Sequence, residues 1–334
     1  YQYATGGWQA ANPLKPEFAR YGTFDKLRET NEVRLNELFA DIAKSKAKPG
    51  TVDQKIADLY NMGMDSTRLN SEGVAPLKAD IDMLMSVDNL QNLAYALATI
   101  HTCAGNPLFS TGVSADLLNS TMNVLYIEQS GLGMGNRDYY LDAENQAKRE
   151  GYVQWLTKAF TMIGWEDAAA KAEQVLAFET KMAEAFRSNV ELRNVTANYN
   201  AMTKAELLAK YPDFNWNAYF GQMGIGDFDK VSVGQPEVLE AVIGLLNNED
   251  IETVKAYLAA SVISSAAGYV GDELYAAHFD FFGRQMSGQQ EMRPRWKRAM
   301  AVPNRLLSDA IGQVYVKKYF PESDKVRMTQ MVKN

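Results

Sequence analysis

The chain has 334 residues, of which 46% are hydrophobic and 22% charged, a composition typical of a folded globular protein. Its 34 basic and 41 acidic side chains give a formal net charge of −7, and no run of Lys and Arg stands out. The electrostatic signature of a nucleic-acid-binding protein is therefore missing, and we expect no nucleic-acid partner. No run approaches the roughly 18 consecutive apolar residues of a membrane span, which predicts no transmembrane segment in this chain.

The first residue and the single cysteine lead to two further predictions. The sequence begins with Tyr1 rather than Met, and no charged and then apolar leader precedes the globular part, which predicts a processed or trimmed product. The single cysteine, Cys103, excludes an internal disulfide. Because Cys103 ends an apolar helical pattern, we predict that it is a core residue rather than a nucleophile.

Helical periodicity dominates the chain. In the stretch 87–103, for example, Leu90, Leu93, Leu97 and Ile100 form one apolar stripe. The predicted helices cover about 24–45, 51–69, 74–85, 87–103, 142–163, 166–188, 203–210, 236–247, 251–270 and a pattern from Trp296 to Val314 that Pro303 is expected to kink.

Only one stretch reads as a strand. Residues 122–129, MNVLYIEQ, combine β-branched and aromatic side chains. Many helices with at most one or two short strands predict a mainly α architecture, and no repeat of fixed period indicates a solenoid.

No complete catalytic site can be read from the residue pattern. The two histidines, His101 and His278, stand in the contexts HTCAG and HFDFF, which lack the spacing of a zinc-binding helix, so we interpret both as core or partly exposed residues. The glycines of GLGMGN at 131–136 lack a phosphate-loop Lys-Ser/Thr and indicate a turn.

Two arginines lie eight positions apart in ARYGTFDKLRE, residues 19–29. One interpretation is a helix entrance with solvated charges, since Gly22 and Thr23 break the chain ahead of apolar residues that are spaced for a helix: Phe24, Leu27, Val33, Leu35, Leu38, Phe39 and Ile42. The other is a pair of side chains for an anionic ligand, because the guanidinium group matches a carboxylate in a bidentate geometry that Lys does not provide. The residue pattern leaves both interpretations of Arg20 and Arg28 open.

Several ordered motifs resemble the neprilysin-like zinc metallopeptidases of family M13. They are YATGGW at 3–8 followed by ARYGTFDKLRE, GLGMGNRDYYL at 131–141, NYNAMTKAEL at 198–207, FFGRQMSG at 281–288, PRWKRAM at 294–300 and AIGQVYVKKYFPESDK at 310–325. The resemblance spans nearly all of the chain. It implies the N-terminal, helical cap portion of such an enzyme, with residues 1–12 packing on a catalytic domain and 13–334 forming the cap.

The departures from the family pattern are also informative. Thr5 and Ala299 stand where mammalian members have cysteines, so the chain resembles a bacterial, disulfide-free member. The family's NAFY, HExxH and ExxxD motifs would follow the point at which this sequence ends. The resemblance therefore implies that the catalytic residues and zinc ligands belong to a full-length parent, that this chain binds no zinc through them, and that the chain alone is inactive.

The resemblance also implies roles for the two arginines and for the domain. Arg20 would bind the free carboxylate of a short peptide substrate, and Arg28 would support it or the neighbouring P2′ residue. The domain would enclose the cleft and restrict substrate size, in a parent that is extracytoplasmic, either periplasmic or lipid-anchored after leader removal. An alternative is a stand-alone helical domain that binds peptides without catalysis.

Overall fold

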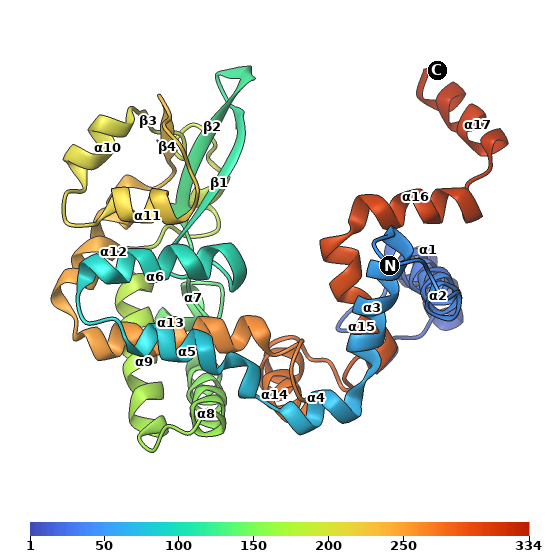
Figure 1. The fold of residues 1–334 in the computed structure, drawn as a ribbon, viewed down its shortest axis with the longest axis horizontal. Helices are drawn as coiled ribbons and strands as arrows, with labels where there is room; N and C mark the ends of the chain where they lie inside the picture. The colour runs from blue at the N-terminus through green and yellow to red at the C-terminus, as the bar shows by residue number, and fades with distance from the viewer. Residues whose placement is uncertain (334) are drawn as a thin grey trace. The chain divides into compact units, whose positions relative to one another are not determined.

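The computed structural model describes residues 1–333 and is mainly α-helical, with one four-stranded sheet (Figure 1). The mainly α prediction is confirmed. The chain divides into two compact units: the first combines Tyr1–Ser71 with the described residues from Phe282 onward, and the second is Glu72–Phe281. The predicted boundary between residues 12 and 13 stays a prediction.

The first unit consists of helices from both ends of the chain. They are α1 (Gln2–Ala11), α2 (Thr23–Lys44), α3 (Val52–Met64), α4 (Ser66–Glu72, ending at the boundary), α15 (Arg295–Leu306), α16 (Ser308–Tyr319) and α17 (Glu322–Lys333). The helix predicted over 51–69 is divided at Asp65, the C-cap of α3. Pro303 lies inside α15, and the helix continues to Leu306 before the break at Leu307.

Helices α2, α3, α15 and α16 enclose the core of the first unit. Its buried members are Leu38, Phe39, Ile42, Ile56, Ala57, Tyr60, Ala299, Met300 and Ile311. Gly63 allows α3 to approach α15 closely, since a Cβ at this position would lie 2.8 Å from the Ala299 Cα. Leu38, Phe39 and Ile42, which belong to the apolar pattern of the helix predicted over 24–45, are part of this core.

The second unit holds the remaining helices. These are α5 (Lys78–Met85), α6 (Leu90–Cys103), α7 (Asp138–Leu141), α8 (Gln146–Met162), α9 (Ala168–Ala185), α10 (Lys204–Lys210), α11 (Trp216–Gln222), α12 (Pro236–Asn248), α13 (Ile251–Ala266) and α14 (Asp272–His278), with short 3-10 turns at η1 (Ala75–Leu77), η2 (Ala143–Asn145) and η3 (Glu191–Arg193). A π-helical stretch, η4 (Phe279–Met286), follows α14.

Helix α13 is the centre of the second unit. It contacts α5, α6, α8 and α9 (Figure 1). Ten of its residues are buried, including Lys255, whose Nζ donates to Glu252 Oε1 at 2.8 Å and to the Met85 carbonyl at 3.1 Å. A helix surrounded on all sides needs apolar residues around its whole circumference, which the run from Val254 to Ile263 supplies.

The sheet has the strand order β1-β2-β4-β3, formed by β1 (Phe109–Asp116), β2 (Asn119–Gln129), β3 (Ala201–Met202) and β4 (Val231–Val233). The β1–β2 and β3–β4 pairs are antiparallel, whereas β2 and β4 are parallel. The strand predicted over 122–129 is confirmed within β2, but the expectation of one or two strands was too low. The middle of β1 is exposed and carries small residues without apolar alternation, and β3 and β4 are too short to show a period.

Candidate functional site

The segment between α1 and α2, which carries Arg20, is fixed to the loop before α15. The backbone N–H groups of Gln290 and Glu291 donate to the Pro16 carbonyl at 2.9 and 3.1 Å. Gln289 Nε2 donates to the Glu17 carbonyl at 3.3 Å. Three hydrogen bonds to two successive carbonyl groups hold the approach to Arg20 in place.

Lys297 lies at the centre of a charged cluster beneath this segment. Its side chain is only 3% exposed, and its Nζ lies 2.5 Å from Glu17 Oε1 and 3.6 Å from Glu32 Oε2. The ammonium group also lies 5.3 Å from the centre of the buried Phe18 ring, and Arg293 pairs with Glu32. Because a buried ammonium group requires compensating charge, Glu17 and Glu32 position both Lys297 and the chain around Phe18.

The two arginines differ in their surroundings. Arg20 is exposed, and its side chain has no hydrogen bond or ion pair within residues 1–333. Arg28, whose side chain is 58% exposed, pairs with Asp25 Oδ1 at 3.0 Å and lies 5.6 Å from the centre of the Phe18 ring. Asp25 Oδ2 also accepts from the Gly22 N–H at 2.9 Å, which caps the start of α2 and confirms the predicted helix entrance. The ligand-binding roles of both arginines stay predictions.

Both histidines lie in the second unit. His101 Nδ1 lies 2.6 Å from Tyr219 Oη and its Nε2 lies 2.9 Å from the Pro107 carbonyl. His278 contacts Trp155 edge to face, with ring centroids 5.1 Å apart. Burial lowers the pKa of each imidazole to about 4, so both are neutral at pH 7. The prediction of core or partly exposed histidines is confirmed.

Cys103 corrects one prediction. It is the last residue of α6 and is exposed, and its Sγ donates to the Thr99 carbonyl at 3.2 Å. The helical stripe predicted burial because periodicity assumes that a neighbour covers the helix along its whole length. The last turn of α6 has no such cover at Thr102 and Cys103.

The sequence reasoning missed a buried carboxylate, Glu179 of α9. It is 1% exposed, and it accepts hydrogen bonds from Tyr140 Oη at 2.5 Å, Tyr152 Oη at 3.0 Å and the Gly133 N–H at 3.3 Å. Burial raises the pKa of Glu179 to about 7, against the opposing effect of these donors. A signal was present, because position 179 falls on the apolar stripe defined by Val175 and Met182.

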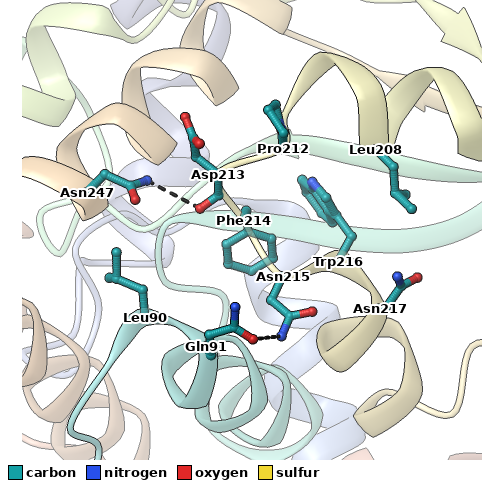
Figure 2. A pocket seen from close by; sticks show the side chains of 10 residues that line it. All are labelled: Leu90, Gln91, Leu208, Pro212, Asp213, Phe214, Asn215, Trp216, Asn217 and Asn247. Carbon is teal, nitrogen blue, oxygen red and sulfur yellow. Dashed lines mark hydrogen bonds between the residues drawn. The ribbon is translucent and has the colours of Figure 1, made fainter.

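A hollow of about 500 Å³ lies in the second unit where α11 begins, near α6 and α12 (Figure 2). Figure 2 shows the two hydrogen bonds at its wall, from Asn215 Nδ2 to Gln91 Oε1 at 3.0 Å and from Asn247 Nδ2 to the Asp213 carbonyl at 3.3 Å. Its lining combines amide side chains and one exposed carboxylate with apolar side chains, among them Phe214 and Trp216. No nucleophile paired with a base is among its lining residues.

The comparisons with known proteins decide the family. A family model described as peptidase family M13 matches residues 1–334. The chain belongs to peptidase family M13. It is 28% identical to human endothelin-converting enzyme 1 over 99% of this chain and 44% of that protein, and 25% identical to neprilysin-11 of Caenorhabditis elegans over 99% and 42%. This M13 chain thus spans less than half the length of these relatives.

Solved structures show the same relationship. The inhibitor complex of the Mycobacterium tuberculosis zinc metalloprotease Zmp1 superposes with a TM-score of 0.92 at 29% identity, over 98% of this M13 chain and 50% of that one. PepO of Lactobacillus rhamnosis, at 23% identity, shares the fold with a TM-score of 0.83 over 100% and 53% of the two chains.

Zmp1 is named as a zinc metalloprotease, which raises the question of whether the described residues of this chain include zinc ligands. Within residues 1–333, no three His, Cys, Asp or Glu side chains are grouped so that they could hold a metal ion. Both ring nitrogens of His101 already have partners. The described residues of this M13 chain therefore do not fit a catalytic zinc. They also include no helix that combines the length and the apolar character needed to cross a bilayer.

Proposed function

We propose that this chain is the N-terminal helical part of a zinc-dependent metalloendopeptidase that hydrolyses short peptides. The observation that carries this proposal is the M13 family match, which covers residues 1–334. Because the chain spans about half of Zmp1 and contains no group of zinc ligands among its described residues, the catalytic residues would belong to the rest of the parent protein. The 334-residue chain alone would then be inactive.

The proposed partner of the first unit is the catalytic domain of the same polypeptide. Large apolar side chains are exposed on three helices of this unit, and they are Tyr3 on α1, Phe24, Leu27 and Val33 on α2, and Met328, Met331 and Val332 on α17. Exposed apolar side chains in such number favour a surface that another domain covers. In the parent, the helical part would enclose the cleft, and the size of the opening would restrict substrates to short peptides.

Arg20 is the proposed anchor for the free carboxylate of the peptide substrate. Its guanidinium group is exposed and has no partner within residues 1–333, while the preceding chain is fixed through Pro16 and Glu17. A positioned guanidinium can form two charge-assisted hydrogen bonds to a carboxylate. Arg28 would support the carboxylate or the P2′ residue, and to do so it would have to leave Asp25 in part.

The proposed location is extracytoplasmic, with the parent either periplasmic or lipid-anchored after removal of a leader. This rests on the resemblance of the motifs to bacterial members of the family. Fractionation of cells that express the whole gene would test it, and recovery of the protein only in the cytoplasm would contradict it.

The first experiment is to read the gene beyond the codon for Asn334. Continuation into NAFY, HExxH and ExxxD motifs supports the proposal. A stop codon at that point overturns it and favours a stand-alone peptide-binding domain. If the gene continues, the chain expressed by itself should show no chelator-sensitive peptidase activity, and such activity in a homogeneous sample would contradict the assignment of the catalytic residues to the rest of the parent.

Kinetics of the full-length protein test Arg20. Arg20→Met should raise KM by about tenfold or more for peptides with a free C-terminus, because a charge-assisted pair is lost, and should leave C-terminally amidated peptides unchanged. Arg34→Met, which removes another exposed arginine of the same unit, is the matched control and should change neither. Equal effects of Arg20→Met on both kinds of peptide would exclude Arg20 from the carboxylate site.

A further inference from the structure

A second cavity, of about 250 Å³, lies within the second unit and is separate from the hollow of Figure 2. Its wall combines α13 with Tyr152 of α8, Glu179 of α9 and two loops, 105–107 and 130–133. The first of these loops precedes β1 and the second follows β2. Both ends of the β1–β2 hairpin therefore border this cavity.

Two glycines let the loop 130–133 pack closely against its neighbours at the edge of the cavity. Gly131 has φ +104°, and a Cβ there would lie 2.3 Å from both the Leu108 nitrogen and the Tyr257 hydroxyl oxygen. A Cβ on Gly133 would lie 1.9 Å from the Tyr152 hydroxyl oxygen. Gly131 and Gly133 of the GLGMGN motif therefore allow the chain to approach Leu108, Tyr257 and Tyr152 closely, in addition to forming a turn. This is a constraint that the sequence pattern did not reveal.

The only charged side chain among the lining residues of this cavity is acidic. Glu179 is the one carboxylate among the lining residues, and no Lys, Arg or His is among them. Its hydrogen-bond partners, Tyr140, Tyr152 and the Gly133 N–H, are all neutral donors. A buried carboxylate without a neighbouring cation has an unfavourable solvation energy, which a cation placed in the cavity would offset.

The same wall presents polar groups without internal partners. The side chains of Asn106, Ser130, Ser261 and Ser264 line the cavity, and none of them has a hydrogen bond within the described part of the chain. Their oxygens are acceptors for N–H groups. Together with the Glu179 carboxylate they offer several acceptors around a space large enough for a small molecule.

We propose that this cavity binds a protonated primary amine, with the ammonium group on Glu179 and its other N–H groups on the hydroxyl and amide oxygens of the wall. An ammonium group has three donors and no acceptor, which suits a wall of acceptors around one negative charge. An anion is disfavoured by Glu179. A divalent cation is disfavoured because the wall provides only one carboxylate.

Binding of an amine in this cavity should depend on pH, because one group of the wall titrates near neutrality. The groups that face Glu179 are Tyr140 from α7, Tyr152 from α8 and Tyr257 from α13, and burial raises the pKa of each well above 10, so they stay neutral near pH 7. Glu179, with its pKa raised to about 7, is the group that changes charge. The ammonium ion binds the ionised carboxylate, so binding should strengthen from pH 6 to pH 8.

The test is a titration of the full-length protein with ethylammonium chloride, followed by saturation-transfer NMR at constant ionic strength. Ethanol, sodium chloride and potassium chloride are the matched probes. We expect binding of ethylammonium that is stronger at pH 8 than at pH 6 and that Glu179→Gln weakens by at least about tenfold. Ser261→Leu, which fills the cavity and leaves the Glu179 network intact, should abolish binding even if Glu179→Gln fails to fold.

Three results would overturn the proposal. They are equal binding of ethanol, which indicates a neutral hydroxyl site; competition by sodium or potassium at equal concentration, which indicates a metal-ion site; and unchanged ethylammonium binding in Ser261→Leu. None of these outcomes bears on the peptidase proposal, which rests on the family match and is tested through the gene and Arg20.

Discussion

Two carboxylate sites, one in each unit, differ in whether a cation lies beside them. In the first unit, the carboxylates of Glu17 and Glu32 face the buried ammonium group of Lys297. In the second unit, Glu179 is buried among tyrosine hydroxyls and one backbone N–H, all of which are neutral. A carboxylate paired with a cation keeps its charge on burial, whereas one without a cation is driven towards protonation. The stability of the second unit should therefore respond to pH near neutrality through Glu179.

The largest effect should come from removing the cation of the first unit. Lys297→Met leaves the partly buried carboxylate of Glu17 without its cation and Glu32 with Arg293 alone, which should lower the free energy of unfolding by about 3 kcal/mol. Urea denaturation followed by circular dichroism measures this change. Lys318→Met, which breaks the exposed pair with Asp41, is the control and should have little effect. Similar losses in both variants would show that burial of the ammonium group is unimportant.

The pH response of the second unit should be the next largest effect. The pKa of Glu179 is raised from 4.5 to about 7, so its contribution to stability is present below about pH 4.5 and is lost as the pH rises through 7. Relative to the wild type, Glu179→Gln should gain about 3 kcal/mol in the free energy of unfolding between pH 4.5 and pH 8. Parallel stability curves for the two proteins would contradict a raised pKa.

The two histidines should lower the stability at acidic pH, and they should do so both in the wild type and in Glu179→Gln. Their pKa values are lowered from 6.5 to about 4, so the stability they contribute is present above pH 6.5 and is lost as the pH falls through 4. Acid titration of Glu179→Gln should retain this loss. An acid branch that disappears in Glu179→Gln would show that the histidines are not its source.

Two glycine substitutions in the second unit should distinguish the effect of close packing on stability from the effect of helix propensity. Gly133→Ala places a Cβ against the Tyr152 hydroxyl and should lower the free energy of unfolding by about 1 to 3 kcal/mol. Gly244→Ala, in α12 with open space around it, should raise it by up to about 1 kcal/mol. Thermal unfolding of both variants measures the difference, and a stabilising Gly133→Ala would show that the Tyr152 hydroxyl can move aside at little cost.

The smallest effect should appear on the exposed apolar surface of the first unit. Phe24 is 86% exposed on α2, so Phe24→Ser should change the stability of the 334-residue chain by less than about 0.5 kcal/mol. In the full-length parent, where we propose that the catalytic domain covers this face, the same substitution should cost more. Equal, small effects in both contexts would place the domain contact elsewhere.

The sequence by itself determined the helical architecture, the family and the position of most helices. The spacing of Leu38, Phe39 and Ile42 identified the face of α2 that becomes buried, because a helix with one apolar face has one way to cover it. Ordered motifs identified the family, since several matches in sequence order are far more specific than one. The same spacing also included Phe24 and Leu27, which are exposed, because periodicity does not show which neighbour covers a face.

Tertiary structure alone decided the partners of the charged groups. Lys297 meets Glu17 across 280 positions, and Glu179 meets Tyr140 across 39, separations over which no local pattern carries information. The exposure of Cys103 and the strand β1 were decided in the same way, by what lies beside them. Periodicity reports which face of an element is apolar, whereas burial, protonation and cavity shape depend on contacts between distant segments, and these exist only once the chain has folded.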